Sequence, residues 1–168
     1  MAGTGPAMRY ERQAFLNIGT SLVPVYKRMG TGFESLDDAL NPAVDEVTYI
    51  SDVSATKSIT AYAPEWSFDG AVIKDSDVIA YLRGIGEDQA TGASAETDVV
   101  LFDVWDVDPD TLEVPCKKFA VAVKMDSIGG GAGGEKLTFG GSLLGKGDPV
   151  DGYFDTATDT FSETASVS

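Results

Sequence analysis

The stretch Lys57-Ser-Ile-Thr-Ala-Tyr-Ala-Pro-Glu-Trp-Ser-Phe-Asp-Gly70 decides the fold class, because its side chains alternate with a period of two. Tyr62, Pro64, Trp66 and Phe68 share one parity, and short, polar or acidic residues occupy the other. Successive side chains of a β-strand point to opposite faces of a sheet, so the stretch predicts a strand with one apolar face. The proline within it indicates an edge position or a bulge.

Further strand patterns lie on both sides of this stretch. Residues 118–126 and 136–144 each alternate large apolar residues with Ala, Gly, Ser, Thr or Lys. Residues 97–107 are apolar on both parities, which predicts a strand covered on both faces, either within the domain or by a neighbouring subunit. Residues 46–51 and 152–162 predict shorter strands.

One helix is predicted over residues 76–85. Asp75 or Ser76 can cap its first turn, and Gly86 supplies a stop. Its apolar residues recur at helical spacing on one stripe, namely at Val78, Ile79, Leu82 and Ile85.

The order of strands, one helix and more strands predicts a mainly β fold with one flanking α-helix, an antiparallel β-sandwich or barrel. The chain of 168 residues fits one domain. We expect an extended N-terminal arm at 1–14, a β domain at 15–156 and a C-terminal tail at 157–168, with a short polar connection at 36–42.

The composition excludes most catalytic and metal-binding classes. The chain has no histidine and a single cysteine, Cys116, so it cannot build a Ser-His-Asp triad, a Cys-His dyad or a thiolate metal cluster. The thiol follows Pro115 and is expected to be inert. We therefore predict no enzyme activity, no catalytic residue, no cofactor and no metal.

The chain carries a net charge of −15, and most of it lies in the C-terminal half. Residues 1–84 have 11 acids and 7 bases, which gives −4, and residues 85–168 have 16 acids and 5 bases, which gives −11. Such a surface repels phosphate, so tight DNA binding is not expected. The sequence shows no apolar run of membrane-spanning length and no secretory signal at its start, which predicts a protein without a membrane anchor that is made in a cytoplasm.

Three motifs resemble the sequences of known binding sites, but each lacks a required residue or the required neighbouring element. Gly129–Gly134 fits a dinucleotide fingerprint but leads into a strand instead of a helix, so it predicts a hairpin loop. Gly140–Lys146 lacks the Ser or Thr of a phosphate-binding loop. Asp106, Asp108 and Asp110 begin like a calcium loop, but the sequence lacks the Gly and Glu that such a loop requires.

Four segments, 57–70, 72–86, 97–106 and 137–149, together resemble the tail tube (major tail) proteins of long-tailed phages. The resemblance implies a β-sandwich or barrel of the tail tube type with a flanking helix. It also implies hexameric rings that stack through extended arms and loops around a bore, through which DNA passes without specific binding. The implied partners are further copies of the chain and the tail tip, tape measure and terminator proteins, and the implied location is the virion of a phage made in a bacterial host.

On this resemblance, the short polar parities face the bore, and Glu65, Asp69 and Asp126 are candidate lumen-facing residues. A ring of six copies at −15 each would carry −90, which would repel passing DNA. Residues 1–14 and 33–56 are the candidate contacts between rings. The candidate contacts between neighbouring subunits, or beneath the helix, are in the doubly apolar strand, at Val99, Leu101 and Trp105.

Two other functions are compatible with the sequence. One is a different ring protein of the virion, such as a tail terminator or a connector. The other is a β-sandwich that binds calcium or carbohydrate, in which Trp66 and Trp105 would stack on sugars.

Overall fold

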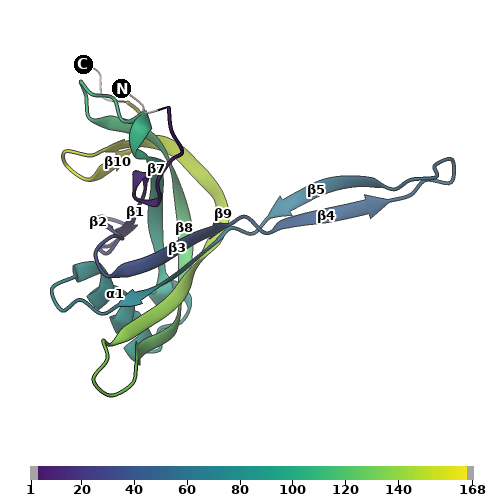
Figure 1. Ribbon diagram of the computed structural model, residues 1–168. Coiled ribbons are helices and arrows are strands. Elements are labelled where there is room, and N and C mark those ends of the chain that lie inside the picture. Colours follow the sequence, from purple (N-terminus) through teal and green to yellow (C-terminus); the bar gives the residue numbers. More distant parts are fainter. Residues whose placement is uncertain (1–3, 166–168) are drawn as a thin grey trace.

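An antiparallel sheet of eight strands and one α-helix form the body of the protein, and a two-stranded ribbon projects from it (Figure 1). The computed structural model describes residues 4–165. This architecture confirms the predicted mainly β fold with one flanking helix. The elements are β1 (Arg12–Asn17), β2 (Tyr26–Arg28), β3 (Phe33–Ala39), β4 (Pro42–Val47), β5 (Thr56–Tyr62), β6 (Glu65–Ala71), α1 (Asp77–Glu87), β7 (Glu96–Asp103), β8 (Glu113–Gly130), β9 (Thr138–Asp155) and β10 (Thr160–Ser162), with 3-10 turns η1 (Arg9–Glu11), η2 (Gly92–Ala95) and η3 (Val104–Asp106).

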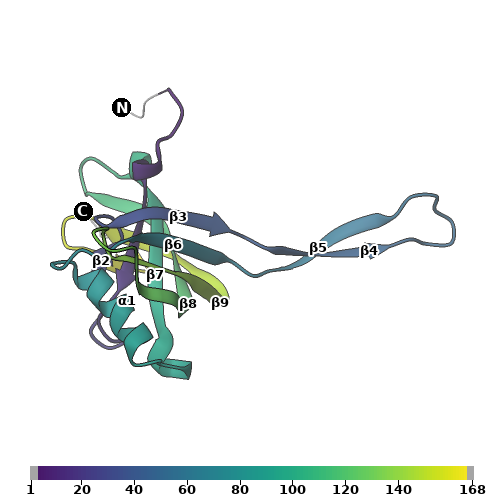
Figure 2. The ribbon, with the colours of Figure 1, turned by 60° about the horizontal axis from the view of Figure 1, so that its bottom comes forward.

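The sheet runs in the order β2-β1-β7-β8-β9-β6-β3, and β10 pairs with the end of β9. Strands β8 and β9 are each 18 residues long and form the centre of the sheet. Their ladder contains register shifts near Lys118, Met125 and Ser127, where the strands bend. The sheet therefore curls into a half-barrel, and α1 lies on the hollow side of the curl (Figures 1 and 2).

Two apolar cores lie on opposite faces of this sheet. The larger core lies beneath α1, on what we call the helix face; the smaller core lies on the opposite face, near the termini. Strand β7 serves both cores, because alternate side chains of one strand point to opposite faces. The helix-face core contains Ala14, Leu16, Met29, Leu36, Trp66, Phe68, Val78, Ile79, Leu82, Val99, Leu101, Val121, Val123, Phe139 and Leu143, and the second core contains Phe15, Tyr26, Val100, Phe102, Val114, Cys116 and Phe154.

Helix α1 begins as its sequence predicts and ends later. The Ser76 hydroxyl accepts a hydrogen bond from the Ile79 amide, which caps the first turn. The expected stop at Gly86 is wrong, because the helix continues to Glu87. Gly86 instead permits close packing on β8: a Cβ at this position would lie 2.4 Å from Cγ2 of Ile128.

Two of the predicted strand boundaries are wrong. The stretch 57–70 is not one strand but two, β5 and β6, which separate at Ala63 and Pro64. The supposed connection at 36–42 is mostly strand β3, which pairs with β6 and buries Leu36 in the core. The strands predicted at 118–126 and 136–144 are present, as the central part of the longer β8 and the first part of the longer β9.

Both terminal segments take part in the sheet. Strand β1 begins at Arg12, within the segment expected to be an arm, and Ala14 is buried in the helix-face core. Strand β10 lies within the expected C-terminal tail 157–168 and within the stretch 152–162 that predicts a strand, and its Phe161 packs against the second core. The ends of the predicted arm and tail, residues 1–3 and 166–168, lie outside the described residues.

Candidate assembly surfaces

Strands β4 and β5 form a ribbon that we call the arm, residues 42–62. The arm continues the β3–β6 hairpin through a joint. Leu40 and Asn41 connect β3 to β4 on one side of this joint, and Ala63 lies on the connection from β5 to β6 on the other. The Ala63 amide donates to the Leu40 carbonyl (3.1 Å), and Asn41 Nδ2 donates to the Ala63 carbonyl (3.1 Å). Asn41 adopts φ 45°, a left-handed conformation that asparagine tolerates. The joint thus redirects both strands away from the body (Figure 2).

The arm is exposed along its whole length. Every residue of β4 and β5 is exposed, although many are apolar. An isolated two-stranded hairpin is marginally stable in water, and exposed apolar surface of this extent is typical of contact sites. The arm is therefore a candidate assembly surface; its large apolar residues are Val44, Val47, Tyr49, Ile50, Val53, Ile59 and Tyr62.

Glu65 and Asp69 lie on the face of β6 opposite the helix-face core. Their neighbours Trp66 and Phe68 are buried, whereas Asp69 is exposed and accepts a hydrogen bond from the Ser35 hydroxyl (2.5 Å). Paired residues share a face, so this side continues across the sheet through the partners of β6 on β9 and β8, which are small or polar except for the partly exposed Leu144. These partners are Gly140, Ser142, Leu144, Ala122 and Lys124.

Asp126 lies two strands away from Asp69 at the same level of the sheet. Gly140 of β9 pairs with Asp69 on one side and with Ser127 on the other. Asp126 is exposed and lies 3.5 Å from Nζ of Lys124. The structure therefore places the three predicted lumen acids on β6 and β8, the two strands that flank β9 in one sheet.

The three predicted subunit contacts have different surroundings. Val99 and Leu101 are only 1% and 5% exposed and belong to the helix-face core of their own chain. Their side chains leave almost no surface for another subunit, so of the two sequence-based alternatives the structure favours burial within the domain. Trp105 lies on the turn η3 and is 44% exposed, so it remains a candidate contact.

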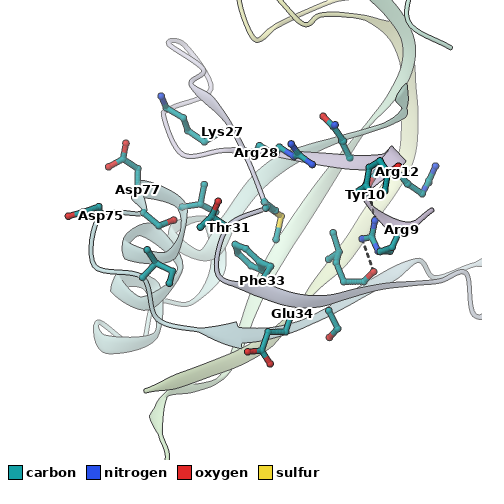
Figure 3. A pocket seen from close by; sticks show the side chains of 18 residues that line it. Arg9, Tyr10, Arg12, Lys27, Arg28, Thr31, Phe33, Glu34, Asp75 and Asp77 are labelled. Carbon is teal, nitrogen blue, oxygen red and sulfur yellow. Dashed lines mark hydrogen bonds between the residues drawn. The ribbon is translucent and has the colours of Figure 1, made fainter. Parts of the chain in front are cut away.

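A groove lies between the free edges of β2 and β3 and the start of α1 (Figure 3). Its volume is about 820 Å³, and Met29, Phe33 and Leu36 form its apolar floor. Basic side chains line the β1–β2 side: Arg9, Arg12, Lys27 and Arg28. At this groove β3 presents an unpaired edge, because it is a terminal strand of the sheet.

Two arginines bridge the opening of the half-barrel at this edge. Arg9 Nη2 donates to the Leu36 carbonyl of β3 (2.9 Å). Arg12 on β1 forms ion pairs with Asp38 on β3 (2.8 Å) and with Asp103 on β7 (3.1 Å). Nothing in the local sequence predicts these contacts, since Arg12 and Asp103 are 91 positions apart.

We expect Arg12→Ala to lower the free energy of unfolding by roughly 1 kcal/mol, because it removes two ion pairs that tie β1 to β3 and β7; the estimate is kept small because the side chain is 42% exposed. Urea denaturation measures the change. Lys57→Ala is the matched control, because its ion pair with Glu46 is more exposed and should contribute nothing measurable. Equal effects of the two substitutions would contradict the bridging role.

The lone thiol is buried beside the second core. Cys116 is 7% exposed, and burial, with a smaller contribution from Asp151, raises the pKa of its thiol from 9.0 to about 12. Burial likewise raises the pKa of the Tyr26 hydroxyl to about 12. Among residues 4–165 no group of three or more acidic, His or Cys side chains is placed to hold a metal ion; Asp108 instead accepts hydrogen bonds from the backbone of its own turn.

The raised pKa of Cys116 predicts that the protein loses stability at alkaline pH. Native Cys116 keeps its proton between pH 9 and 12 while the unfolded thiol loses it, so the free energy of unfolding should fall as pH rises through this window. At pH 8, alkylation of the native thiol should be slower than in the unfolded chain by on the order of a thousandfold or more, because only the thiolate reacts. Maleimide labelling with and without denaturant measures this ratio, and similar rates would contradict the buried position.

No protein-family model matches the chain, and no curated protein matches it by sequence. Solved structures do match its fold. A chain from the tail of an empty gene transfer agent (GTA) particle, determined with C6 symmetry, aligns with a TM-score of 0.59 and 12% identity over 86% of this chain and 97% of that one. A chain from the virion of a native gene transfer agent particle aligns with a TM-score of 0.58 and 12% identity, over the same shares of both chains.

A third match is a chain of the anti-feeding prophage baseplate, with a TM-score of 0.50 and 12% identity over 89% of this chain and 97% of that one. The protein has the fold of phage tail-type proteins. At 12% identity this likeness describes the tail-type fold and does not identify binding residues. Among the described residues, no helix has the length and apolar character needed to cross a membrane.

Proposed function

We propose that this chain is the structural subunit of a phage tail tube, which self-assembles into stacked hexameric rings around an acidic bore for DNA. The observation that carries the proposal is the arm, an exposed apolar ribbon on a chain with the tail-type fold. A monomer gains nothing from such a ribbon, whereas a stacked assembly buries it. The C6 symmetry of the similar GTA tail supports six copies in each ring.

The candidate assembly surfaces can be assigned to contacts along the tube axis, to the bore and to contacts within a ring. The arm serves contacts between rings; it shares residues 42–56 with the predicted contact segment 33–56, whose first part is strand β3 of the body. The face that carries Glu65 and Asp69 serves the bore, because most of its side chains are short and its acids repel phosphate. Trp105 is the proposed contact between neighbouring subunits. In the virion, the ends of such a tube would meet tail tip and terminator proteins, and its bore would hold the tape measure protein before DNA passes.

Electron microscopy of the purified protein tests the proposal. At high protein concentration we expect long tubes of constant diameter with sixfold symmetry in cross-section. Single rings that never stack would instead support the alternative of a tail terminator or connector. Monomers under all conditions, including the presence of a tail tip complex, would refute both.

The carbohydrate alternative loses one of its two aromatic residues. Trp66 is 3% exposed and packs against Phe119 with ring centroids 4.7 Å apart, so it cannot stack on a sugar. Trp105 alone remains accessible.

A further inference from the structure

The groove beside β2 is lined by four basic side chains and by three acidic ones, Glu34, Asp75 and Asp77. Four of the chain's twelve basic residues thus line the groove, and Figure 3 shows Lys27 and Arg28 on one rim and Asp75 and Asp77 on the other. Among residues 4–165, neither Lys27 nor Arg28 has an acidic side chain within 4.0 Å. Both side chains are exposed, so this rim offers two uncompensated cations above an apolar floor.

The outer part of the arm has the complementary chemistry. Residues 42–56 contain three acids, Asp45, Glu46 and Asp52, and no base; of these, Glu46 is paired with Lys57 of β5 (3.4 Å). The tip carries two of the most exposed apolar side chains of the chain, Ile50 and Val53. An apolar tip flanked by acids matches the one rim of the groove that carries Lys27 and Arg28.

The arm cannot reach the groove of its own chain. Strand β3 begins at the groove with Phe33 and ends at the joint of the arm with Ala39, so its length separates the two surfaces. Both ribbon views show the arm pointing away from β2 and α1 (Figures 1 and 2). From Asn41 to the tip the arm spans roughly 30 Å, at about 3.3 Å per residue. Only a second copy can therefore supply an arm to this groove.

We propose that the arm tip of one copy docks in the groove between β2, β3 and α1 of another copy. The contact is head-to-tail, because donor and acceptor are different surfaces, and such contacts propagate into open polymers or close into rings. Ile50 and Val53 would cover Phe33 and Ile73, the accessible apolar side chains of the groove, while Asp45 or Asp52 would approach Lys27 and Arg28. This inference rests on the proposed tube function and adds to it the acceptor surface.

Cross-linking between two singly substituted chains tests the contact directly. Ile50→Cys and Thr31→Cys protein are mixed, assembled and treated with a short bismaleimide; buried Cys116 does not compete. We expect a cross-linked dimer that contains one chain of each kind. Ile50→Cys mixed with Thr91→Cys is the control and should give none, because Thr91 follows the opposite end of α1.

A charge exchange provides an independent measurement. Lys27→Glu/Arg28→Glu should raise the protein concentration required for polymerisation more than tenfold, and so should Asp45→Lys/Asp52→Lys. The four substitutions combined should return this concentration to within about threefold of the original. The control combines the two groove substitutions with Asp110→Lys/Asp148→Lys; it restores the same net charge elsewhere and should not restore assembly.

The outcomes separate this inference from the proposed function. Tubes that form without the Ile50–Thr31 cross-link, and that tolerate the reversed groove charges, would overturn the docking contact and leave the tube intact. Absence of any ordered polymer from the original protein would overturn the tube and, with it, the contact. A cross-link together with rescue by the charge exchange would support both.

Discussion

Replacement of the arm, residues 42–62, by a single glycine is expected to abolish tube formation and leave the folded body intact. The Ala63 amide already donates to the Leu40 carbonyl, so the cut ends lie within one turn of each other. The new sequence Leu40-Asn41-Gly-Ala63 is a two-residue hairpin of the Asn-Gly type, which needs positive φ at both central positions. Asn41 already has φ 45°.

The body should tolerate this deletion because no residue of β4 or β5 is buried. We expect its melting temperature to remain within about 3 °C of that of the full chain, measured by circular dichroism. Sedimentation and electron microscopy should find no polymer at concentrations at which the full chain assembles completely.

A second variant separates the length of the arm from its chemistry. Tyr49→Ser/Ile50→Ser/Val53→Ser keeps the ribbon and removes the apolar tip, and it should also fail to assemble. Polymerisation of either variant at the original concentration would contradict a role for the arm. An unfolded deletion variant would show that the ribbon supports the body, which its exposure argues against.

The second large effect is expected at Trp66. Trp66→Ala should lower the free energy of unfolding by about 3–5 kcal/mol, because it removes a side chain that is 3% exposed from the middle of the helix-face core. Tyr62→Ala should cost less than about 0.5 kcal/mol, because Tyr62 lies on the arm and is 58% exposed. Guanidinium denaturation of both variants provides the comparison.

This pair also tests the division of the stretch 57–70. The sequence places both aromatic residues on one parity of one strand, which predicts similar costs. The structure places a break between them, at Ala63 and Pro64. Comparable losses at the two positions would mean that the arm packs on the body and would contradict the described joint.

Strong local signals allowed much of the body to be predicted. Period-two alternation identified the central part of β8 and the first part of β9, and the apolar stripe with Ser76 identified α1. These patterns are reliable because burial of one face requires them whatever the distant partners are. The end of the helix was missed because Gly86, a typical stop signal, is needed here for its small size beside Ile128.

The arm was the main feature that the sequence analysis missed. A signal was present: Asn41-Pro42 and Ala63-Pro64 interrupt two neighbouring strand patterns at positions that face each other in the hairpin. Alternation alone cannot reveal where the arm leaves the body, because β5 and β6 share a parity while only β6 packs on a core. The same ambiguity applied to Val99 and Leu101, whose apolar character is equally suited to an internal core or a subunit contact.

The sequence by itself determined the β-rich class, the single helix, the acidic surface and the lack of histidine chemistry, since each follows from local pattern or composition. Only the tertiary structure decided which apolar residues are enclosed, that a ribbon stands free of the body, and that Arg12 reaches Asp38 across the open barrel. The physical reason is that burial and charge pairing depend on which strands become neighbours. That choice arises from the curl of the whole sheet, which no short segment encodes.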